Sequence, residues 1–430
     1  MTPTVFSQDD IKAFGARAEL MVNSLGTVSA EPDRLVRLFL TPEHRRAADR
    51  VAGWMREAGL SVSEDALGTV RGRLEGQEPK EEPKEEGPRR LLIGSHIDTV
   101  IDAGMYDGPF GVIAGILAAE YFSRKPLRFG IDVLAFGDEE GSRFPATLSS
   151  SSACAGVFKL ENLALADRNG VTLCDAIKAY GKSPDDIAAA AYRADEAAAY
   201  VEVHIEQGPV LEARRQPLGV VTAIIGQSYL NVEFLGEAGH AGTVPMLLRR
   251  DALAGAAEAM LLGETLARET KGEVVATVGR LAVSPGATNV IPANVVVIFD
   301  IRSGSEAARA RLADALKSGV RAIADRRHLG LTITSTREVA TTPCAPQIQD
   351  CFADAVRALG ANPLRLGSGA GHDGQAMAKL CPIGMLFVRC RGGISHNPME
   401  YANPQDLGLA VAALIGFIER FDPSALASAP

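Results

Sequence analysis

The sequence lacks a basic excess and a long apolar run, and each absence excludes a class of function. Its 430 residues carry 44 Lys and Arg against 53 Asp and Glu, which gives a formal net charge of −9. Proteins that neutralise nucleic-acid phosphates usually carry a basic excess. A helix that crosses a bilayer needs about 20 consecutive apolar residues, and no run in this chain approaches that length. We therefore expect neither a nucleic-acid partner nor a membrane partner.

Cysteine is scarce as well, which argues against a disulfide-rich or thiolate-metal protein. The chain has six cysteines, and none forms a pair at the short spacing typical of zinc ligands. The opening residues, MTPTVFSQDDIK, are polar and acidic, unlike a signal peptide. These features favour a reduced, cytoplasmic setting.

The chain is too long for one ordinary hydrophobic core, so we expect two domains. In residues 1–215 short apolar strands alternate with helices, which predicts an α/β domain around a mostly parallel sheet. Residues 216–335 change to strand, helix, two strands, helix and strand, a pattern typical of a ferredoxin-like antiparallel sheet. The alternation of strands and helices seen in residues 1–215 resumes in residues 336–430. The sequence therefore predicts a catalytic domain, 1–215 with 336–430, interrupted by an α+β lid at 216–335.

Three features are expected to lie at the surface without a functional role. The stretch from Gln77 to Arg89 is rich in proline and charge, and it predicts a solvated loop between neighbouring strands. His44 and His328 lie in charged helical sequence, and we expect both side chains to be exposed.

Three adjacent carboxylates, Asp138, Glu139 and Glu140, follow the apolar stretch IDVLAF. Like charges repel, so their position at the end of a buried strand indicates a positive charge nearby. The side chains of adjacent residues in an extended segment diverge. One glutamate could therefore bind a metal while the other faces a bound water as general base, and Asp138 is expected to be structural.

Five of the seven histidines lie in polar, glycine-bounded motifs. They are His96, His204, His240, His372 and His396. His96 and Asp98 end a strand two residues apart, so both point to one face. There, one could bind metal while the other hydrogen-bonds the far nitrogen of the ring. Asp107 lies in a turn before a helix, where a carboxylate could bridge two cations.

A set of residues at strand-to-loop junctions suits a pair of metal ions. The set is His96, Asp107, Glu140, His204 and His396. Two ions about 3.5–4 Å apart need one bridging carboxylate and further ligands for each ion. Any one of these residues alone would more often be structural. The complete set, in a domain whose site should lie beyond the carboxyl ends of the strands, predicts a two-metal centre.

These motifs resemble those of the M20-type di-metal amidohydrolases. The likeness is closest to their ureide branch, which contains allantoate, ureidoglycolate and N-carbamoyl-L-amino acid amidohydrolases. It extends from about Asp33 to Phe421, and the motifs occur in the order of the family. The matching stretches are GSHIDTV, YDGPFGV, DEEGSRFP, HIEQGPVLE, GHAGTVPMLLRRDA, NVIPANV, SGAGHD and GGISHNP.

The resemblance implies a role for each residue of the centre. The two ligand sets would be His96, Asp107 and His204 for one metal, and Asp107, Glu140 and His396 for the other. The resemblance implies two divalent ions per chain, either Mn²⁺ or Zn²⁺. The nitrogen and oxygen donors of this set suit both metals and do not decide between them. Glu139 would be the general base. The peptidase branch usually has a carboxylate at the position of His204, and the resemblance also implies a cis peptide bond between Asp107 and Gly108.

The resemblance also assigns contacts to the substrate. His240 would stabilise the oxyanion in the active site of a partner subunit, which makes a homodimer through the lid part of the mechanism. Asn289 and Arg302 would bind the substrate carboxylate, although Arg302 could instead form a salt bridge with Asp300. Further pocket candidates are Gln207, Gly369, Gly371 and His372. His372 could instead brace its loop.

The C-terminal run GMLFVRCRGGISHNPMEY resembles allantoate and ureidoglycolate hydrolases more than bacterial carbamoylases. We therefore predict metal-dependent hydrolysis of a ureido C–N bond in a small carboxylate substrate, with release of ammonia and CO2 and with allantoate as the first choice. N-carbamoyl-L-amino acids and then ureidoglycolate are the alternatives, ahead of a dipeptidase or aminopeptidase and of a non-catalytic relative. The run ATLSSSSACAG, residues 146–156, departs from the branch and could alter the pocket wall.

Overall fold

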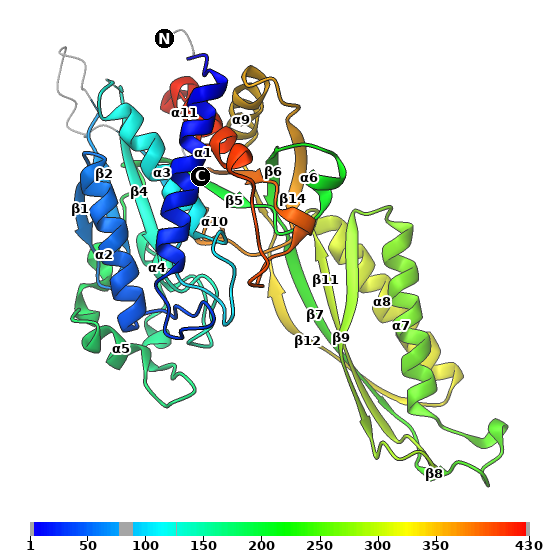
Figure 1. Ribbon diagram of the computed structural model, residues 1–430. Coiled ribbons are helices and arrows are strands. Elements are labelled where there is room, and N and C mark those ends of the chain that lie inside the picture. Colours follow the sequence, from blue (N-terminus) through cyan, green and yellow to red (C-terminus); the bar gives the residue numbers. More distant parts are fainter. Residues whose placement is uncertain (1–3, 77–88, 126, 427–430) are drawn as a thin grey trace. The chain divides into compact units, whose positions relative to one another are not determined.

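The computed structural model describes residues 4–76, 89–125 and 127–426 (Figure 1). The loop predicted at 77–89 lies outside these residues apart from Arg89. The chain divides into two compact units, Met1–Thr222 with Cys344–Pro430, and Ala223–Pro343. The second unit begins later than the predicted 216 because β6 (Leu218–Ile224), a strand that the sequence analysis did not assign, pairs with the sheet of the first unit.

A mixed sheet forms the centre of the first unit. The described strands follow the order β1-β2-β4-β3-β5-β15-β6-β13, with β14 paired to β6. The neighbours β4, β3, β5 and β15 are parallel, whereas the outer pairs are antiparallel. The predicted α/β fold with a mostly parallel central sheet is therefore confirmed. The other strands are β1 (Ser61–Glu64), β2 (Val70–Leu74), β3 (Arg90–His96), β4 (Gly130–Phe136), β5 (Ala197–Ile205), β13 (Thr342–Pro343), β14 (Leu364–Ser368) and β15 (Ile383–Val388).

Helices pack against this sheet and share a hydrophobic core with it. The core joins the strands to side chains from α1, α2, α3, α9 and α11. The helices of the first unit are α1 (Gln8–Gly26), α2 (Pro42–Glu57), α3 (Pro109–Phe122), α4 (Ser149–Cys154), α5 (Leu173–Ala179), α6 (Val210–Ala213), α9 (Pro346–Ala358), α10 (Gly374–Met377) and α11 (Pro404–Arg420). None of the described helices combines the length and the apolar character needed to span a bilayer.

The start of α2 corrects the prediction for His44. Thr41 caps the helix as predicted, and its side chain accepts a hydrogen bond from the backbone N–H of His44. The side chain of His44 is fully buried, with Nδ1 3.1 Å from the hydroxyl of Tyr180. The reason is helical periodicity, because His44 begins the stripe that continues through Ala48 and Val51 into the core. Burial lowers the pKa of His44 to about 4.

α3 lies close against the sheet because two of its residues have no side chain. A Cβ on Gly111 would lie 2.2 Å from the carbonyl oxygen of Val203, and a Cβ on Gly115 would lie 3.1 Å from Ile93. This contact places the first turn of α3 next to the carboxyl ends of β3 and β5. The loop that enters α3 carries Asp107, so the packing of one helix sets the position of a predicted metal ligand.

The second unit contains a four-stranded antiparallel sheet in the order β12-β7-β11-β9. α7 and α8 contact each other and β7, β9 and β11, so both helices cover one face of this sheet (Figure 1). The helices and strands of the second unit are β7 (Gly226–Leu235), β8 (Gly239–His240), α7 (Ala252–Glu269), β9 (Val274–Ser284), β10 (Val290–Ile291), β11 (Asn294–Ser303), α8 (Glu306–Arg326) and β12 (Gly330–Val339). β8 and β10 pair with each other in a separate two-stranded sheet. The role of this unit as a lid stays a prediction.

Candidate metal centre

The predicted metal ligands meet beyond the carboxyl ends of the parallel strands. His96 is the last residue of β3, and His204 is the penultimate residue of β5. The other ligands lie in loops that follow β4, precede α3 or follow β15. Ligand atoms in each of two groups lie within 4.8 Å of one another: His96, Asp107 and His204, and Asp107, Glu140 and His396. The structure thus brings together all five residues, in the two expected sets.

Asp107 is common to both groups because its two oxygens face different histidines. Its Oδ1 lies 3.2 Å from Nε2 of His204 and 3.6 Å from Nε2 of His96. Its Oδ2 lies 3.3 Å from Nε2 of His396, which is also 3.6 Å from Oε2 of Glu140. A carboxylate shared in this way has the geometry required to bridge two ions.

The tautomers of two histidines leave ring lone pairs that suit a cation. Nδ1 of His204 lies 2.9 Å from the carbonyl oxygen of Ile205, and Nδ1 of His96 lies 3.2 Å from that of Asp98. A carbonyl only accepts, so each Nδ1 is the donor and each neutral ring keeps a lone pair on Nε2. Nε2 of His204 is buried and makes no hydrogen bond of good geometry among the described residues, although Oδ1 of Asp107 lies only 3.2 Å away. A buried nitrogen that faces a carboxylate in this way fits a metal ligand.

Asp98 holds the two glutamates of the acidic run by their backbone. Its Oδ1 accepts a hydrogen bond from the N–H of Glu139, and its Oδ2 accepts one from the N–H of Glu140, both at 3.2 Å. Oδ1 also lies 3.5 Å from Nδ1 of His96. One carboxylate therefore contacts the ring of His96 and the backbone of both glutamates.

The carboxylates and histidines of the centre shift one another's pKa values. Burial raises the pKa of Glu140 to about 7, and the charge of Asp107 adds to this effect. Burial also raises the pKa of Glu139 well above its ordinary value. The hydrogen bond with Asp107 raises the pKa of His396 to about 9. Carboxylates crowded in this way are stabilised in their ionised form by a nearby positive charge.

Glu139 lies beside the centre without belonging to the two expected ligand sets. Its Oε2 is 3.9 Å from Nε2 of His96. A Cβ on Gly371 would lie 3.8 Å from its Oε1, so the predicted glycine loop approaches this carboxylate. Glu139 also forms a potential ligand group with His96 and Glu140. This carboxylate is therefore close enough to the candidate ligands to act on a molecule bound beside them.

Two of the predicted pocket residues contact candidate metal ligands directly. Nε2 of Gln207 donates a hydrogen bond to Oδ2 of Asp107 at 2.7 Å. His372 is buried, its Nε2 lies 2.7 Å from Oγ of Ser368, and its ring packs edge-on against His204 with 4.5 Å between centroids. These contacts favour the bracing role for His372 over contact with a substrate. Gly369 lies in the same loop, between β14 and α10.

The remaining predicted residues lie in the second unit, at opposite ends of its sheet. The carbonyl oxygen of Asn289 accepts a hydrogen bond from Ala241, the residue after His240. Arg302 lies near the other end of β11 and pairs with Asp300 at 2.8 Å. Residues 294 and 302 are separated by eight strand positions, which corresponds to roughly 27 Å. The structure brings His240 and Asn289 together, but it keeps Arg302 apart from them.

Sequence reasoning missed several residues that support the centre. Glu202 lies on β5 two positions before His204, and it accepts hydrogen bonds from Ser95, Tyr200 and Gly374. The two-residue period of a strand could have revealed it. Arg37 is fully buried, and its guanidinium donates to the carbonyl oxygen of Ile97, between His96 and Asp98. No local signal identifies Arg37, because its partners come from distant loops.

Three serines of the run after the acidic motif are buried, and their hydroxyls contact the turn that carries the acidic residues. Ser149, Ser150 and Ser151 are at most 1% exposed. The hydroxyl of Ser149 donates a short hydrogen bond to Oδ2 of Asp138, and that of Ser150 accepts one from Gly137 at 3.2 Å. The run therefore anchors the turn that presents Glu139 and Glu140.

The turn after Asp107 differs from the one that the resemblance implied. Among the described residues the cis peptide bond is Ser284–Pro285, and the bond between Asp107 and Gly108 is trans. Gly108 makes the turn with φ of +81°, a conformation that glycine adopts without steric cost. A Cβ at this position would lie 2.5 Å from the ring of His96. The glycine is needed for both its backbone conformation and its lack of a side chain.

Comparison with known proteins identifies the family of the chain. Residues 92–420 match the family described as peptidase family M20/M25/M40. The chain belongs to this family. Among curated M20 relatives, an N-carbamoyl-L-amino acid amidohydrolase of Geobacillus stearothermophilus is 40% identical over 403 residues, which cover 93% of this chain and 97% of the relative. An allantoate deiminase of Arabidopsis thaliana is 38% identical over 431 residues, which cover 93% and 81%.

A solved structure of the same kind supports this membership. An amidase of the hydantoinase/carbamoylase family from Burkholderia multivorans is 32% identical and superposes with a TM-score of 0.86. The match covers 94% of this chain and 97% of that one. The M20 resemblance inferred from the motifs is therefore confirmed.

Gly108→Ala tests whether this M20 chain needs an empty position beside His96. Gly170→Ala is the matched control, because Gly170 has φ of +79° but nothing within 4 Å of its Cβ position. We expect Gly170→Ala to lower the free energy of unfolding by about 1–2 kcal/mol from backbone strain. Overlap with His96, together with the less favourable ψ of −61° at this position, should add about 1–3 kcal/mol for Gly108→Ala. Chemical denaturation measures both values, and equal losses would contradict the steric argument.

Proposed function

We propose that this protein is a two-metal amidohydrolase that cleaves a ureido or N-carbamoyl C–N bond. The observation that carries the proposal is the pair of ligand groups that share Asp107, with Glu139 beside them. The names of the relatives, which include N-carbamoyl-L-amino acid amidohydrolase and allantoate deiminase, support the same reaction class. Water would add to the ureido carbon, and the products would be an amine, CO2 and ammonia.

The donor set fits two divalent ions. His96 and His204 would supply Nε2 to one ion, Glu140 and His396 would serve the other, and Asp107 would join both. Imidazole and carboxylate donors suit Mn²⁺ and Zn²⁺ alike. Bound ions of this kind polarise a carbonyl and lower the pKa of water.

The side chains of the chain would carry the proton and hold the substrate. Glu139 would take a proton from the attacking water and deliver it to the leaving nitrogen. Asp98 keeps Glu139 in place through its backbone N–H. His240 would donate to the developing oxyanion. Asn289 and Arg302 would bind the substrate carboxylate, and Gly369 and Gly371 would let the backbone approach it.

Allantoate is the first substrate that we propose, because the segment from β15 to the HNP motif resembles allantoate hydrolases. N-carbamoyl-L-amino acids are the second candidate, since a relative with that activity in its name is 40% identical to this chain. Both are ureides with a carboxylate, so the same ligands, base and carboxylate contacts would serve either substrate.

We propose that the working form is a homodimer in which the second unit of each chain serves the site of the other. Within one chain His240 pairs with Val290, just before β11 begins, whereas Arg302 lies near the other end of β11, roughly 27 Å along the strand from its first residue. A small ureide cannot contact both residues of the same chain. If both bind one substrate, one of them comes from a second copy.

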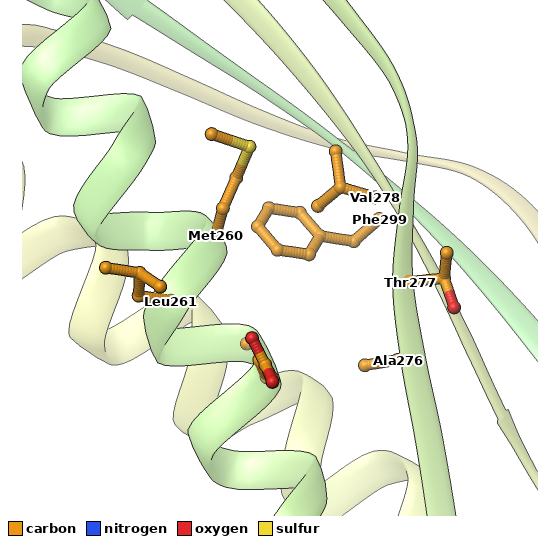
Figure 2. A pocket seen from close by; sticks show the side chains of 8 residues that line it. Met260, Leu261, Ala276, Thr277, Val278 and Phe299 are labelled. Carbon is orange, nitrogen blue, oxygen red and sulfur yellow. The ribbon is translucent and has the colours of Figure 1, made fainter.

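Exposed apolar side chains on the second unit support association through this unit. Leu247, next to the His240 motif, is 97% exposed. Leu261 on α7 and Val275 on β9 are also exposed, and β9 is the last strand in the described sheet. A hollow of about 290 Å³ lies between these two elements, with Met260 and Phe299 in its lining (Figure 2). Such a surface suits a second copy of this chain.

A substrate panel tests the reaction class. With Mn²⁺-loaded enzyme, we expect ammonia release to be fastest with allantoate and slower with N-carbamoyl-L-alanine, ureidoglycolate and β-ureidopropionate. Dipeptides should release no amine. Faster turnover of N-carbamoyl-L-alanine would move the assignment to the second candidate, and faster turnover of a dipeptide would overturn the ureide proposal.

Glu139→Gln tests the assignment of the base. We expect turnover to fall by about two to four orders of magnitude, the usual contribution of general acid–base catalysis. Both ions should remain, because the glutamine leaves the two ligand groups intact. Glu140→Gln is the contrasting variant and should lose an ion. Metal analysis and turnover are measured on the same samples, and a fully active Glu139→Gln protein would refute the role.

Complementation between two inactive variants tests the shared site. Homodimers of Glu139→Gln and of His240→Ala should both be impaired. A heterodimer, isolated with two affinity tags, holds one site with an intact Glu139 and an intact partner His240, so it should regain about half of the wild-type turnover. A differently tagged Glu139→Gln homodimer is the control. No recovery in the heterodimer would show that His240 acts within its own chain.

A further inference from the structure

Glu400 is a buried carboxylate that has no part in the reaction proposed above. It lies in the loop between η4 (Arg391–Gly393) and α11 and is 4% exposed. A buried carboxylate normally pairs with a cation. Within the described residues, Glu400 instead accepts hydrogen bonds from two backbone amides and one hydroxyl. These partners belong to two loops of the metal centre.

The two oxygens of Glu400 join those loops. Its Oε1 accepts hydrogen bonds from the N–H of Tyr106 at 2.8 Å and from the N–H of Asp107 at 3.1 Å. Its Oε2 lies 2.8 Å from Oγ of Ser395, the neighbour of His396. One side chain therefore connects the loop of the shared carboxylate with the loop of the last histidine.

The loop of Asp107 packs directly on this carboxylate. A Cβ on Gly104 would lie 2.3 Å from Cδ of Glu400, so the backbone at this position has no room for a side chain. Removing the carboxylate would leave a cavity and two buried N–H groups without partners. Both effects would allow the segment that carries Asp107 to move.

His396 depends on its loop more than the other histidine ligands do. Its side chain is 49% exposed, whereas those of His96 and His204 are 1% exposed. Core packing holds the two buried rings. The ring of His396 has less packing to hold it, so its distance to Asp107 depends on the link through Ser395 and Glu400.

We propose that Glu400 is a positioning residue that sets the spacing of Asp107 and His396, and thereby the affinity of the ion that these residues share with Glu140. The inference rests on the two-metal function proposed above. Glu400 acts through backbone amides and Ser395, and it does not itself contact the ion or the substrate.

The hydrogen-bond pattern around Ser395 provides a discriminating variant. Oγ of Ser395 lies 2.7 Å from Oδ2 of Asp107 and 2.8 Å from Oε2 of Glu400. The hydroxyl has one proton, so it donates to only one of these two carboxylate oxygens at a time, and it accepts a hydrogen bond from Nε2 of Gln207 at 3.2 Å. A glutamine at position 400 fits this arrangement, since its oxygen can accept from the backbone and its amide can donate to Ser395. Glu400→Gln should therefore keep the spacing that Glu400→Ala loses.

Calorimetric titration of the full-length apo protein with Mn²⁺ alone tests the proposal. Wild type and Glu400→Gln should bind two ions with similar affinity. In Glu400→Ala the ion shared by Asp107, Glu140 and His396 should bind about 10–100-fold more weakly, the usual effect of removing a group that orients a ligand. The ion at His96 and His204 should weaken less, because these two buried rings are held by the core. Asp65→Ala is the control, because Asp65 also accepts two backbone N–H groups, from Leu67 and Thr69, away from the centre.

The outcomes separate this inference from the function on which it rests. A wild-type protein that binds no Mn²⁺ would overturn both. Two ions of unchanged affinity in Glu400→Ala, or an equal loss in Glu400→Gln, would overturn the role of Glu400 alone. Should Glu400→Ala not fold, Ser395→Ala breaks the same link with a smaller change, and it should weaken the same single ion by several fold.

Discussion

The carboxylate of Asp107 is the point on which the candidate site depends, because three histidines from distant parts of the chain face its two oxygens. Much of the surrounding structure holds this group in place. Glycines in α3 bring the helix against the sheet, and Gly108 leaves space for the ring of His96. Several distant parts of the chain therefore contribute to the position of the Asp107 carboxylate.

The sheet explains why ligands so distant in sequence can meet. In parallel strands every carboxyl end lies at the same edge, so the loops after β3, β4, β5 and β15 open on one region. A short run of residues at each end is enough to build the site, and the apolar strands between those runs are free to form the core. The second unit is a separate compact body with its own core.

Much of the fold, and the residues that meet at the candidate centre, could be predicted from the sequence, because both depend on local pattern. Strand and helix periodicity placed β3, β4 and α7, and polar residues at strand ends indicated His96 and His204. The sequence did not predict the environment of side chains whose contacts come from distant parts of the chain. His44 reads as a surface residue in a charged helix but falls on its buried stripe, and Arg37 and Glu400 act through loops far away in the chain.

The difference in burial between the histidines gives the centre an inner and an outer position. The rings of His96 and His204 are enclosed, whereas His396 is half open to solvent. If two ions bind as proposed, the ion at His96 and His204 would be the more enclosed, and the ion at His396 would be the more open to solvent. The open position would then exchange its ion faster when the surrounding metal supply changes.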